Sequence, residues 1–414
     1  MKKIGVPLVL FLSVFVLSFG IATGFSFQPK WYLDYFNPLA QSIRQGRFDI
    51  VNPPVTYDLV QYGGKWYAPW GMLPALFLIP VQLIKGRFVP PLYLTLFFAS
   101  ADVVVFYFLL RRIKQEFLPY LSESSLWLAL FLFAFGTTHI YVGTLGSVWH
   151  VDQMVSNFFG TLGIYSVFKK KRTQWSYFFS VLCFGVVLMG RATIVLLVSI
   201  PALLYSWDFF LSAMVLWKQK VRAIRNGIAI FGIPLGIFTG IFFLYNWLRF
   251  GNPLEYGYRF ITEAPNLSSL RERYGIMSLS HVATNIRYMF FELPTLYWSH
   301  GLRLNFDLKG SSIFYLTPPF LAIFLAKFWR RVRGRLIIDP YILSLWVAAI
   351  ITMIPSLLLY STGWMQFGYR YSLDITAILV LLLLFGLEGK INALYIVGVV
   401  FSVIVYQMGI IALR

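Results

Sequence analysis

The chain has 414 residues, of which 58% are hydrophobic, 19% aromatic and only 12% charged. A soluble protein carries roughly twice that charged fraction, so the composition excludes a soluble globular protein and indicates a polytopic membrane protein. The formal charge of +19 does not indicate nucleic-acid binding, because the basic residues form short clusters: Arg111-Arg112, Lys169 to Arg172, Lys218 to Arg225 and Arg330 to Arg335. Such clusters at helix ends are typical of topology signals and of contacts with anionic lipid.

Eleven apolar runs reach or approach the length that crosses a bilayer. They lie near residues 4–24, 90–110, 125–144, 148–168, 174–190, 192–206, 226–248, 312–328, 341–360, 374–388 and 391–411. We therefore predict an all-α polytopic protein with a single membrane domain over residues 1–414. The first run could be a cleaved signal peptide, but its length favours a retained first helix.

Residues 71–85 form a further apolar segment that is short and contains Pro74 and Pro80. If the N-terminus is cytoplasmic, all four basic clusters lie inside only when this segment does not cross. We therefore predict an interfacial or re-entrant helix here, although this places Lys85 and Arg87 outside. The protein is expected in the plasma membrane.

This topology leaves two long outer loops, residues 25–89 and 249–311, which we expect to form an outward-facing site. Most acids fall on that side: Asp34, Asp49, Asp58, Asp152, Glu255, Glu263, Glu272, Glu292, Asp307 and Asp374. Asp102 instead lies in the middle of the second apolar run. An acid in the bilayer is costly, so Asp102 should pair with an arginine or lysine of another helix, or stay protonated.

Three stretches carry a resemblance to a known family. The first loop contains Asp34-Tyr35, Gly46-Arg47-Phe48, Asp58-Leu59, Gly64-Lys65-Trp66-Tyr67 and Gly71-Met72-Leu73-Pro74, in that order. Later patches read FGNPLEYGYRF at 250–260 and GWMQFGYRY at 363–371. With the helix order, these resemble the GT-C superfamily of integral-membrane glycosyltransferases, most closely the branch of protein O-mannosyltransferases and aminoarabinose transferases.

The resemblance implies a GT-C-like bundle of about eleven transmembrane helices. It also implies transfer of a sugar, hexose or pentose, from a polyprenyl-phosphate-linked donor to an acceptor at the outer face. The family has a catalytic acid in the first outer loop, often one of a pair. Asp34 occupies that place here, although Tyr35 follows it instead of a second acid. Asp152 resembles the acid that the family places at the outer end of a later helix.

Inverting transfer from such a donor needs a base for the acceptor, and one carboxylate suffices because phosphate is already a good leaving group. Asp34 is the first candidate for this base. The alternative is that Asp34 caps an interfacial helix over residues 35–46, since Asp is a favoured N-cap. In that case the base is to be sought at Asp152 or Glu255, with Asp58 a further candidate.

The departing phosphate needs fixed cations, and the planar fork of arginine suits it. Arg191 follows an apolar run, while Arg259 and Arg370 each follow a Gly-Tyr pair, so that Tyr258 and Tyr369 are donor-binding candidates too. Two such patches suggest one shared anionic ligand. The alternative is interfacial anchoring, which also gathers Tyr and Arg at membrane boundaries. A weaker phosphate candidate is Lys65.

A divalent metal is compatible with carboxylate and phosphate ligands, but its signal is weak. His150 and Asp152 are two residues apart and point to different faces of a helix, so a metal would need further ligands such as Asp34 or His300. Hydrogen bonding at the outer face is the alternative role. The single cysteine, Cys183, excludes an internal disulfide and a multi-cysteine metal site. His139 and His281 are expected to be structural.

Two other classes of protein remain open at this stage. A lipid-linked sugar transporter or flippase would place ionisable residues through the membrane, as Asp102 does, and would have repeated halves. A non-catalytic protein of envelope-polymer assembly would tolerate changes in its acids. The expected partners are the lipid-linked donor, an acceptor that is a lipid, glycan or protein, and membrane lipids. The sequence does not identify the sugar or the carrier length.

Overall fold

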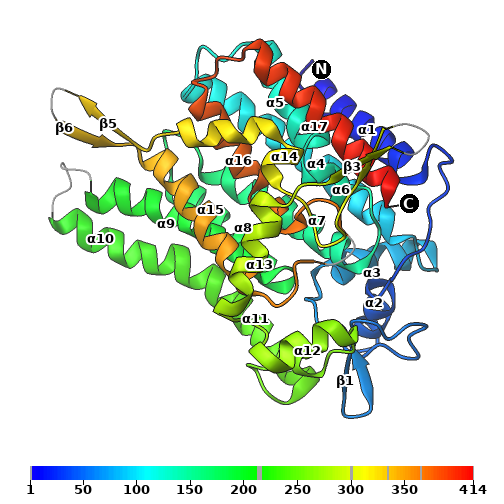
Figure 1. Cartoon of the computed structure of the whole chain (residues 1–414). Helices are drawn as coiled ribbons and strands as arrows, with labels where there is room; N and C mark the ends of the chain where they lie inside the picture. Colours follow the sequence, from blue (N-terminus) through cyan, green and yellow to red (C-terminus); the bar gives the residue numbers. More distant parts are fainter. Residues whose placement is uncertain (1, 212–216, 299–301, 333–334, 364–365, 414) are drawn as a thin grey trace.

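The computed structural model describes residues 2–211, 217–298, 302–332, 335–363 and 366–413 (Figure 1). Within them the α-helices are α1 (Lys2–Thr23), α2 (Phe36–Arg44), α3 (Leu73–Lys85), α4 (Pro91–Glu116), α5 (Glu123–Phe135), α6 (Thr138–Gly143), α7 (Val148–Val167), α8 (Gln174–Val186), α9 (Ser199–Ser206), α10 (Trp217–Gly227), α11 (Ile233–Phe250), α12 (Pro265–Tyr274), α13 (Val282–Ile286), α14 (Ile313–Leu316), α15 (Pro340–Leu358), α16 (Leu373–Gly386) and α17 (Ala393–Ala412). The strands are β1 (Val60–Tyr62), β2 (Lys65–Tyr67), β3 (Thr295–Trp298), β4 (Leu302–Asn305), β5 (Trp329–Val332) and β6 (Arg335–Ile338).

The strands form three separate antiparallel hairpins, so the described chain has no larger sheet. In the first, Val60 pairs with Tyr67 and Tyr62 with Lys65. Its two-residue turn is Gly63-Gly64, with φ of 57° and 74°. Tight hairpin turns favour positive φ at both central residues, and glycine adopts it without strain.

Every one of the eleven predicted runs contains helix. Among the residues that the structure describes, six helices are long and apolar enough to cross a bilayer by length and composition: Gly5–Thr23, Pro91–Glu116, Ala192–Phe210, Lys220–Phe250, Pro340–Leu358 and Ala393–Ala412. α7 is as long, with 20 residues, but is more polar, and the helices of the other runs are shorter.

Two interruptions meet each other inside the molecule. The run 125–144 breaks at Gly136 between α5 and α6, and the run 312–328 contains only the short α14 and a 3-10 helix, Pro318–Leu325. Prolines cannot donate a backbone hydrogen bond, which accounts for the second break. The Thr317 hydroxyl donates to the Gly136 carbonyl at 2.9 Å. The second break therefore helps to satisfy the backbone of the first, as an apolar surrounding requires.

Within residues 71–85, Leu73–Lys85 forms the helix α3, which packs against α2. The Gln82 amide donates to the backbone oxygen of Asn37 at 3.0 Å and to its side-chain oxygen at 3.1 Å. A helix of 13 residues is about 20 Å long, shorter than the ~30 Å of a bilayer core. This length suits the predicted interfacial or re-entrant helix.

The centre of the bundle is α16, in which residues 373 to 384 are all buried. It packs against α7, which in turn packs against α4 and α8. At the periphery, α1 and α11 present mostly apolar exposed side chains, such as Val9 and Ile237. An apolar outer surface is what a helix in contact with lipid needs. This arrangement confirms the all-α polytopic class predicted from the sequence.

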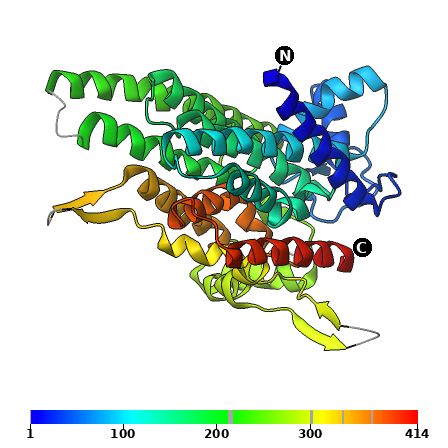
Figure 2. The ribbon, with the colours of Figure 1, turned by 90° about the horizontal axis from the view of Figure 1, so that it is seen from above.

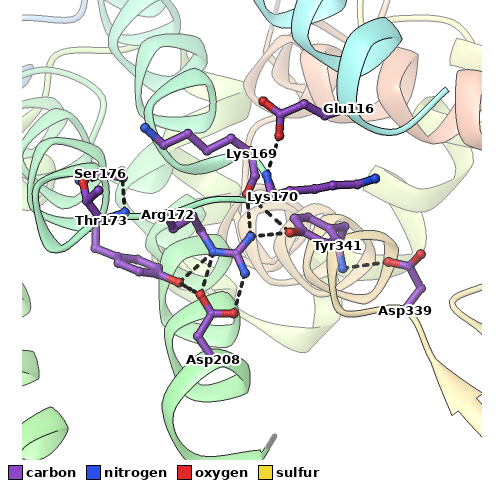
Figure 3. Close-up of polar contacts among 10 residues, drawn as sticks. Glu116, Lys169, Lys170, Arg172, Thr173, Ser176, Asp208, Asp339 and Tyr341 are labelled. Atoms are coloured by element: carbon purple, nitrogen blue, oxygen red, sulfur yellow. Dashed lines mark hydrogen bonds and ion pairs between the residues drawn. The ribbon is translucent and has the colours of Figure 1, made fainter. Parts of the chain in front are cut away.

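The basic clusters gather at one end of the molecule. Figure 1 shows α10 and the β5–β6 hairpin at the same end, and Figure 2 agrees. The loop after α7 lies there too, because the Arg172 guanidinium binds the Asp208 carboxylate at 2.5 Å and the Tyr341 hydroxyl at 2.7 Å (Figure 3). Arg111 pairs with Glu123 at 2.8 Å, which joins the end of α4 to the start of α5.

The N-terminal end of α1 lies on the same side as these clusters. Phe11 contacts Phe97 with ring centroids 5.5 Å apart, and Phe19 contacts Tyr93 at 5.6 Å. The later residue of α1 thus contacts the earlier residue of α4, so the two helices are antiparallel. α1 therefore begins near the end of α4 that carries Arg111. The fold is thus compatible with one cytoplasmic end that holds the N-terminus and all four clusters.

Candidate functional site

A cavity of about 500 Å³ lies at the other end of α7, away from the basic clusters. Its walls come from distant parts of the chain. The lining residues are Tyr32, Leu33, Val55, Tyr57, Asp58, Trp149, Leu267, Ser361 and Arg370. The first long loop, the start of α7, α12 and the segment before α16 therefore meet here.

Asp58 is the carboxylate of this cavity. Its Oδ2 accepts a hydrogen bond from the Trp149 indole at 3.1 Å. Burial raises the pKa of Asp58 to about 6, with a smaller contribution from Glu263, while the Trp149 hydrogen bond and the charge of Arg370 act in the opposite direction. The Asp58 backbone has φ of 59°, in the left-handed region that Asp and Asn tolerate best after glycine.

Arg370 is the cation of the cavity. The side chain is almost wholly buried, and its Nε has no hydrogen-bond partner among the described residues. The guanidinium carbon lies 5.3 Å from the Tyr371 ring centroid and 5.9 Å from that of Trp149. A buried guanidinium with unused donor capacity is suited to bind an anion.

Arg191, in contrast, is neutralised by an acid. Its Nε lies 2.9 and 2.7 Å from the two oxygens of Asp374, and its guanidinium stacks on the other side of the site over Tyr371, 4.7 Å from the ring centroid. The Gln153 amide donates to both Asp374 and the Arg370 carbonyl at 2.9 Å. Gln153 and the Arg191–Asp374 pair therefore fix the start of α16, and with it Arg370.

Asp152 lies one helical turn into α7, beside Arg191. It is buried, and its Oδ1 has no hydrogen-bond partner in the described chain. A Cβ on Gly190 would lie 3.1 Å from that oxygen and 2.5 Å from the Ser156 hydroxyl. The Ser156 hydroxyl also accepts from the Arg191 backbone N–H at 2.9 Å. Glycine at 190 thus lets the chain carrying Arg191 approach α7 closely.

The second outer loop contributes Tyr258. Burial raises the pKa of its hydroxyl, and the charges of Tyr371, Arg191, Asp58 and Asp152 also act on it. Tyr258 is therefore a neighbour of Asp58, Asp152 and Arg191. It connects the Gly-Tyr-Arg patch of residues 257–259 to the patch that contains Arg370.

Asp34 is placed at the start of α2. Its Oδ1 accepts from the Asn37 backbone N–H at 3.1 Å, and its Oδ2 accepts from the Asn37 side chain at 2.6 Å. Burial raises the pKa of Asp34, and the hydrogen bonds to Asn37 oppose this. Both oxygens are engaged as in an N-cap, the alternative that the sequence left open. The preceding residue, Leu33, does line the cavity.

Of the predicted site residues, Asp58 and Arg370 line the cavity, and four that have not yet been placed do not. Lys65 is exposed on the β1–β2 hairpin. The Arg259 side chain is 77% exposed and lies 3.9 Å from Glu255. The arginines of the two Gly-Tyr-Arg patches therefore differ, because Arg370 is buried and lines the cavity. The Tyr369 hydroxyl points elsewhere and donates to the Asn285 side chain at 3.1 Å.

The histidine candidates do not form a metal site with Asp152 in the described residues. His150 Nδ1 lies 2.5 Å from the Ser147 hydroxyl and its Nε2 lies 3.3 Å from the Tyr141 hydroxyl. No group of three or more His, Cys, Asp or Glu residues with metal-binding geometry occurs among the residues that the structure describes. His300 lies outside the described residues.

Asp102 lies in the core, fully buried between α4, α6 and α7. The Asn157 amide donates to its Oδ2 at 2.7 Å, and His139 Nε2 lies 3.3 Å from the same oxygen. The partners are therefore an amide and an imidazole, so the first of the two expected alternatives, pairing with an arginine or lysine, is not found in these contacts. These contacts give His139 the structural role predicted for it.

Sequence reasoning assigned no role to three residues that build the site: Trp149, Gln153 and Asp374. Trp149 and Gln153 flank His150 and Asp152, and one turn of α7 places all four at the same end of the helix. Asp374 follows Arg370 by four residues, the spacing that aligns side chains on a helix. The sequence signal that could have identified Asp374 is its position as an acid at the start of the otherwise apolar run 374–388.

No family model matches the chain, and no curated protein matches its sequence. Among solved structures, the chain is similar to the archaeal oligosaccharyltransferase AglB from Archaeoglobus fulgidus, determined in complex with an inhibitory peptide and a dolichol-phosphate. The match has a TM-score of 0.50 and 12% sequence identity, and covers 99% of this chain and 56% of that chain.

AglB is a GT-C superfamily enzyme, so the similarity confirms the GT-C-like fold that the motifs of the loops predicted. The present chain is an integral-membrane protein of this fold class. It spans a little over half the length of the AglB structure.

Proposed function

We propose that the protein is a membrane glycosyltransferase that moves a single sugar from a polyprenyl-phosphate-linked donor to an acceptor at the outer face of the membrane. The observation that carries the proposal is the cavity that a buried arginine with an unpartnered Nε, Arg370, and a half-buried carboxylate, Asp58, line together. The GT-C-like fold supports it, as does the dolichol-phosphate, itself a polyprenyl phosphate, in the AglB complex.

In the proposed reaction, a carboxylate removes the proton of an acceptor hydroxyl while the oxygen attacks the anomeric carbon of the sugar. The bond between this carbon and the phosphate oxygen breaks, and its electron pair leaves with the phosphate. Attack from the opposite face inverts the configuration at the anomeric carbon. Arg370 binds the phosphate and stabilises the negative charge that develops on it.

The geometry favours Asp58 as the base. Asp58 lines the cavity together with Arg370, and a pKa of about 6 keeps it ionised yet basic at neutral pH. Asp34, which the family resemblance favours, has both oxygens bound to Asn37. We therefore assign Asp34 to positioning α2 and the cavity wall at Leu33.

The remaining polar groups then have supporting roles. Tyr258 lies near both acids and arginines and is suited to contact the sugar or the phosphate. Arg191 already has Asp374 as its counter-ion, so its charge contributes less to phosphate binding than that of Arg370. Asp152, next to Arg191, is suited to hydrogen-bond a sugar hydroxyl through its unpartnered oxygen.

The transporter alternative rests on Asp102. Within the described residues, Asp102 has an amide and an imidazole as neighbours and is one buried cluster, not one of a series of ionisable groups along the bundle. The assembly-protein alternative predicts that the acids of the cavity tolerate substitution. Donor turnover separates both alternatives from the transferase.

The test uses purified protein in lipid vesicles, a panel of polyprenyl-phosphate sugars and a crude envelope acceptor, with release of free polyprenyl phosphate as the readout. Asp58→Asn should lower turnover by at least ~100-fold, the scale of a lost general base. Arg370→Gln should lower kcat/KM by about 100- to 1,000-fold. Arg259→Gln, in the exposed triplet, is the matched control and should retain turnover.

Asp34→Asn separates the two first-loop acids, because Asn is as good an N-cap as Asp and only the charge is removed. Retained turnover supports Asp58 as the base. Loss of turnover with an unchanged melting temperature, together with an active Asp58→Asn variant, would assign the base to Asp34 instead. If native protein turns over no donor, the transferase proposal fails.

A further inference from the structure

Two cations lie close together at the end of the bundle opposite the cavity. Arg112 is in the last turns of α4, and Lys169 directly follows α7. Arg112 Nη1 donates to the Tyr165 backbone carbonyl, and the guanidinium carbon lies 3.9 Å from the Tyr165 ring centroid. Burial and the charge of Arg112 lower the pKa of Lys169. The positive charges of Arg112 and Lys169 therefore repel each other unless an anion binds between them.

The acids of this end are engaged by other groups. Glu116 accepts from the Lys170 backbone N–H at 2.5 Å, and Asp208 binds Arg172 (Figure 3). Glu123 lies 2.8 Å from Arg111 and 2.7 Å from Lys114. Only Glu116 acts on Lys169, raising its pKa by less than Arg112 lowers it. The pair of Arg112 and Lys169 is therefore left with net positive charge.

An apolar surface adjoins the two cations on the side toward the middle of α4. Phe108 precedes Arg112 by four residues and so lies on the same face of α4. It is 40% exposed, and its ring centroid lies 6.4 Å from that of Tyr165. From the centre of the bundle to its end, the surface is thus aromatic and then cationic. A phospholipid has the same order, with an acyl chain followed by a phosphate.

We propose that Arg112 and Lys169 bind the head-group phosphate of an anionic phospholipid, with an acyl chain lying against Phe108 and Tyr165. Inorganic phosphate shares the anionic chemistry, but it would leave the aromatic surface unused. The aromatic side chains therefore favour the lipid. This site does not depend on glycosyl transfer, because it lies at the opposite end of α7 from the cavity.

The experiment compares purified native protein with Arg112→Gln/Lys169→Gln. Lipid retention is counted by native mass spectrometry after exchange into mixtures of phosphatidylglycerol and phosphatidylcholine. The matched control is Arg225→Gln/Lys327→Gln, which removes one arginine and one lysine from exposed positions at the same end. A separate arm adds inorganic phosphate, or phosphatidylglycerol below its micellar concentration, and follows thermal unfolding.

Native and control proteins should retain one tightly held phosphatidylglycerol, and the double variant should bind it about 25-fold more weakly, or about fivefold for each charge removed. Because Arg112 also contacts the end of α7, Lys169→Gln alone serves as a second variant that leaves this contact intact. It should weaken binding about fivefold.

Equal retention by native protein and Lys169→Gln would overturn the proposal. So would retention without preference for phosphatidylglycerol over phosphatidylcholine. Stabilisation by inorganic phosphate as large as that by the lipid would replace it with a free-anion site.

Discussion

Asp58 occupies an environment that disfavours its charged form. The cavity wall removes much of its hydration, and burial is the largest cause of its raised pKa. The Trp149 indole and Arg370 offset part of that cost. A group in this position is unfavourable for folding at neutral pH, and sites of this kind are associated with chemistry.

This environment gives a prediction for stability. The folded-state pKa of about 6 lies above the ordinary aspartate pKa of 3.8, so between these values the folded state binds more protons and the free energy of unfolding decreases as pH rises. At pH 7 to 8, Asp58→Asn should therefore raise the free energy of unfolding by about 1–3 kcal/mol. Asn also tolerates the positive φ at this position.

Thermal unfolding of native and Asp58→Asn protein between pH 4 and 8 measures this difference. The gain should shrink below pH 6 and disappear near pH 4. A gain that is independent of pH would show that the Asp58 charge is not its cause. Over the same range, turnover by native protein should rise with pH through about 6, because the base acts in its ionised form.

The site residues differ in how far the sequence could predict them. Arg191 was predicted because it follows an apolar run, and Arg370 because it follows a Gly-Tyr pair. Asp152 was predicted because it resembles the acid that the family places at the outer end of a later helix. Asp58 and Tyr258 also reach the site, whereas Arg259 and Lys65 are exposed, although their local sequences look equally suitable. The conformations of long loops decide that difference, and hydropathy carries no information about them.

Glycines determine how closely the first outer loop approaches the bundle. A Cβ on Gly71 would lie 2.1 Å from the Met189 carbonyl oxygen, next to the chain that carries Arg191. The backbone at 189 leads directly into Gly190 and Arg191. The first loop and the break between α8 and α9 are therefore in contact, and a side chain between them would separate the two walls of the site.

Gly71→Ala should therefore reduce both stability and donor turnover, with a destabilisation of about 1–3 kcal/mol from overpacking. Gly240→Ala is the control, because a Cβ there meets nothing within 4 Å and alanine is the better helix former. It should be neutral or slightly stabilising. Equal melting temperatures for the two variants would contradict the close approach at Gly71.

At the scale of elements, run length and apolar composition predicted where helices occur, since a bilayer permits few other structures. The breaks at Gly136 and at residues 317–319 were not predicted. Prolines account for the second break, whereas the Gly136 carbonyl at the first is satisfied by the Thr317 hydroxyl, from a segment far away in sequence. The capping role of Asp34 was foreseen only as an alternative, because an acid before a helix is equally typical of a cap and of a base.

The molecule as a whole has two chemically different ends. One carries the basic clusters, α10 and the β5–β6 hairpin, and the other carries the cavity and the β1–β2 hairpin (Figure 1). Because positive charge is retained on the cytoplasmic side, we predict that the cavity faces outward.

Single-cysteine labelling in intact cells tests this orientation. Cys183, the one native cysteine, is buried and is first replaced by alanine. Lys65→Cys, on the β1–β2 hairpin, should react with a membrane-impermeant maleimide from outside. Lys327→Cys, at the basic end, should react only after the cells are permeabilised. The reverse pattern would place the cavity in the cytoplasm.

The cavity also has a consequence for how the protein is made. Its lining runs from Tyr32 to Arg370, and Asp374 fixes Arg370 through Gln153. A chain emerging from the ribosome from its N-terminus holds the carboxylate Asp58 long before it holds its cation. No growing chain that has not yet reached α16 contains the complete lining of the cavity, so a polypeptide terminated before Arg370 lacks the cation of the cavity.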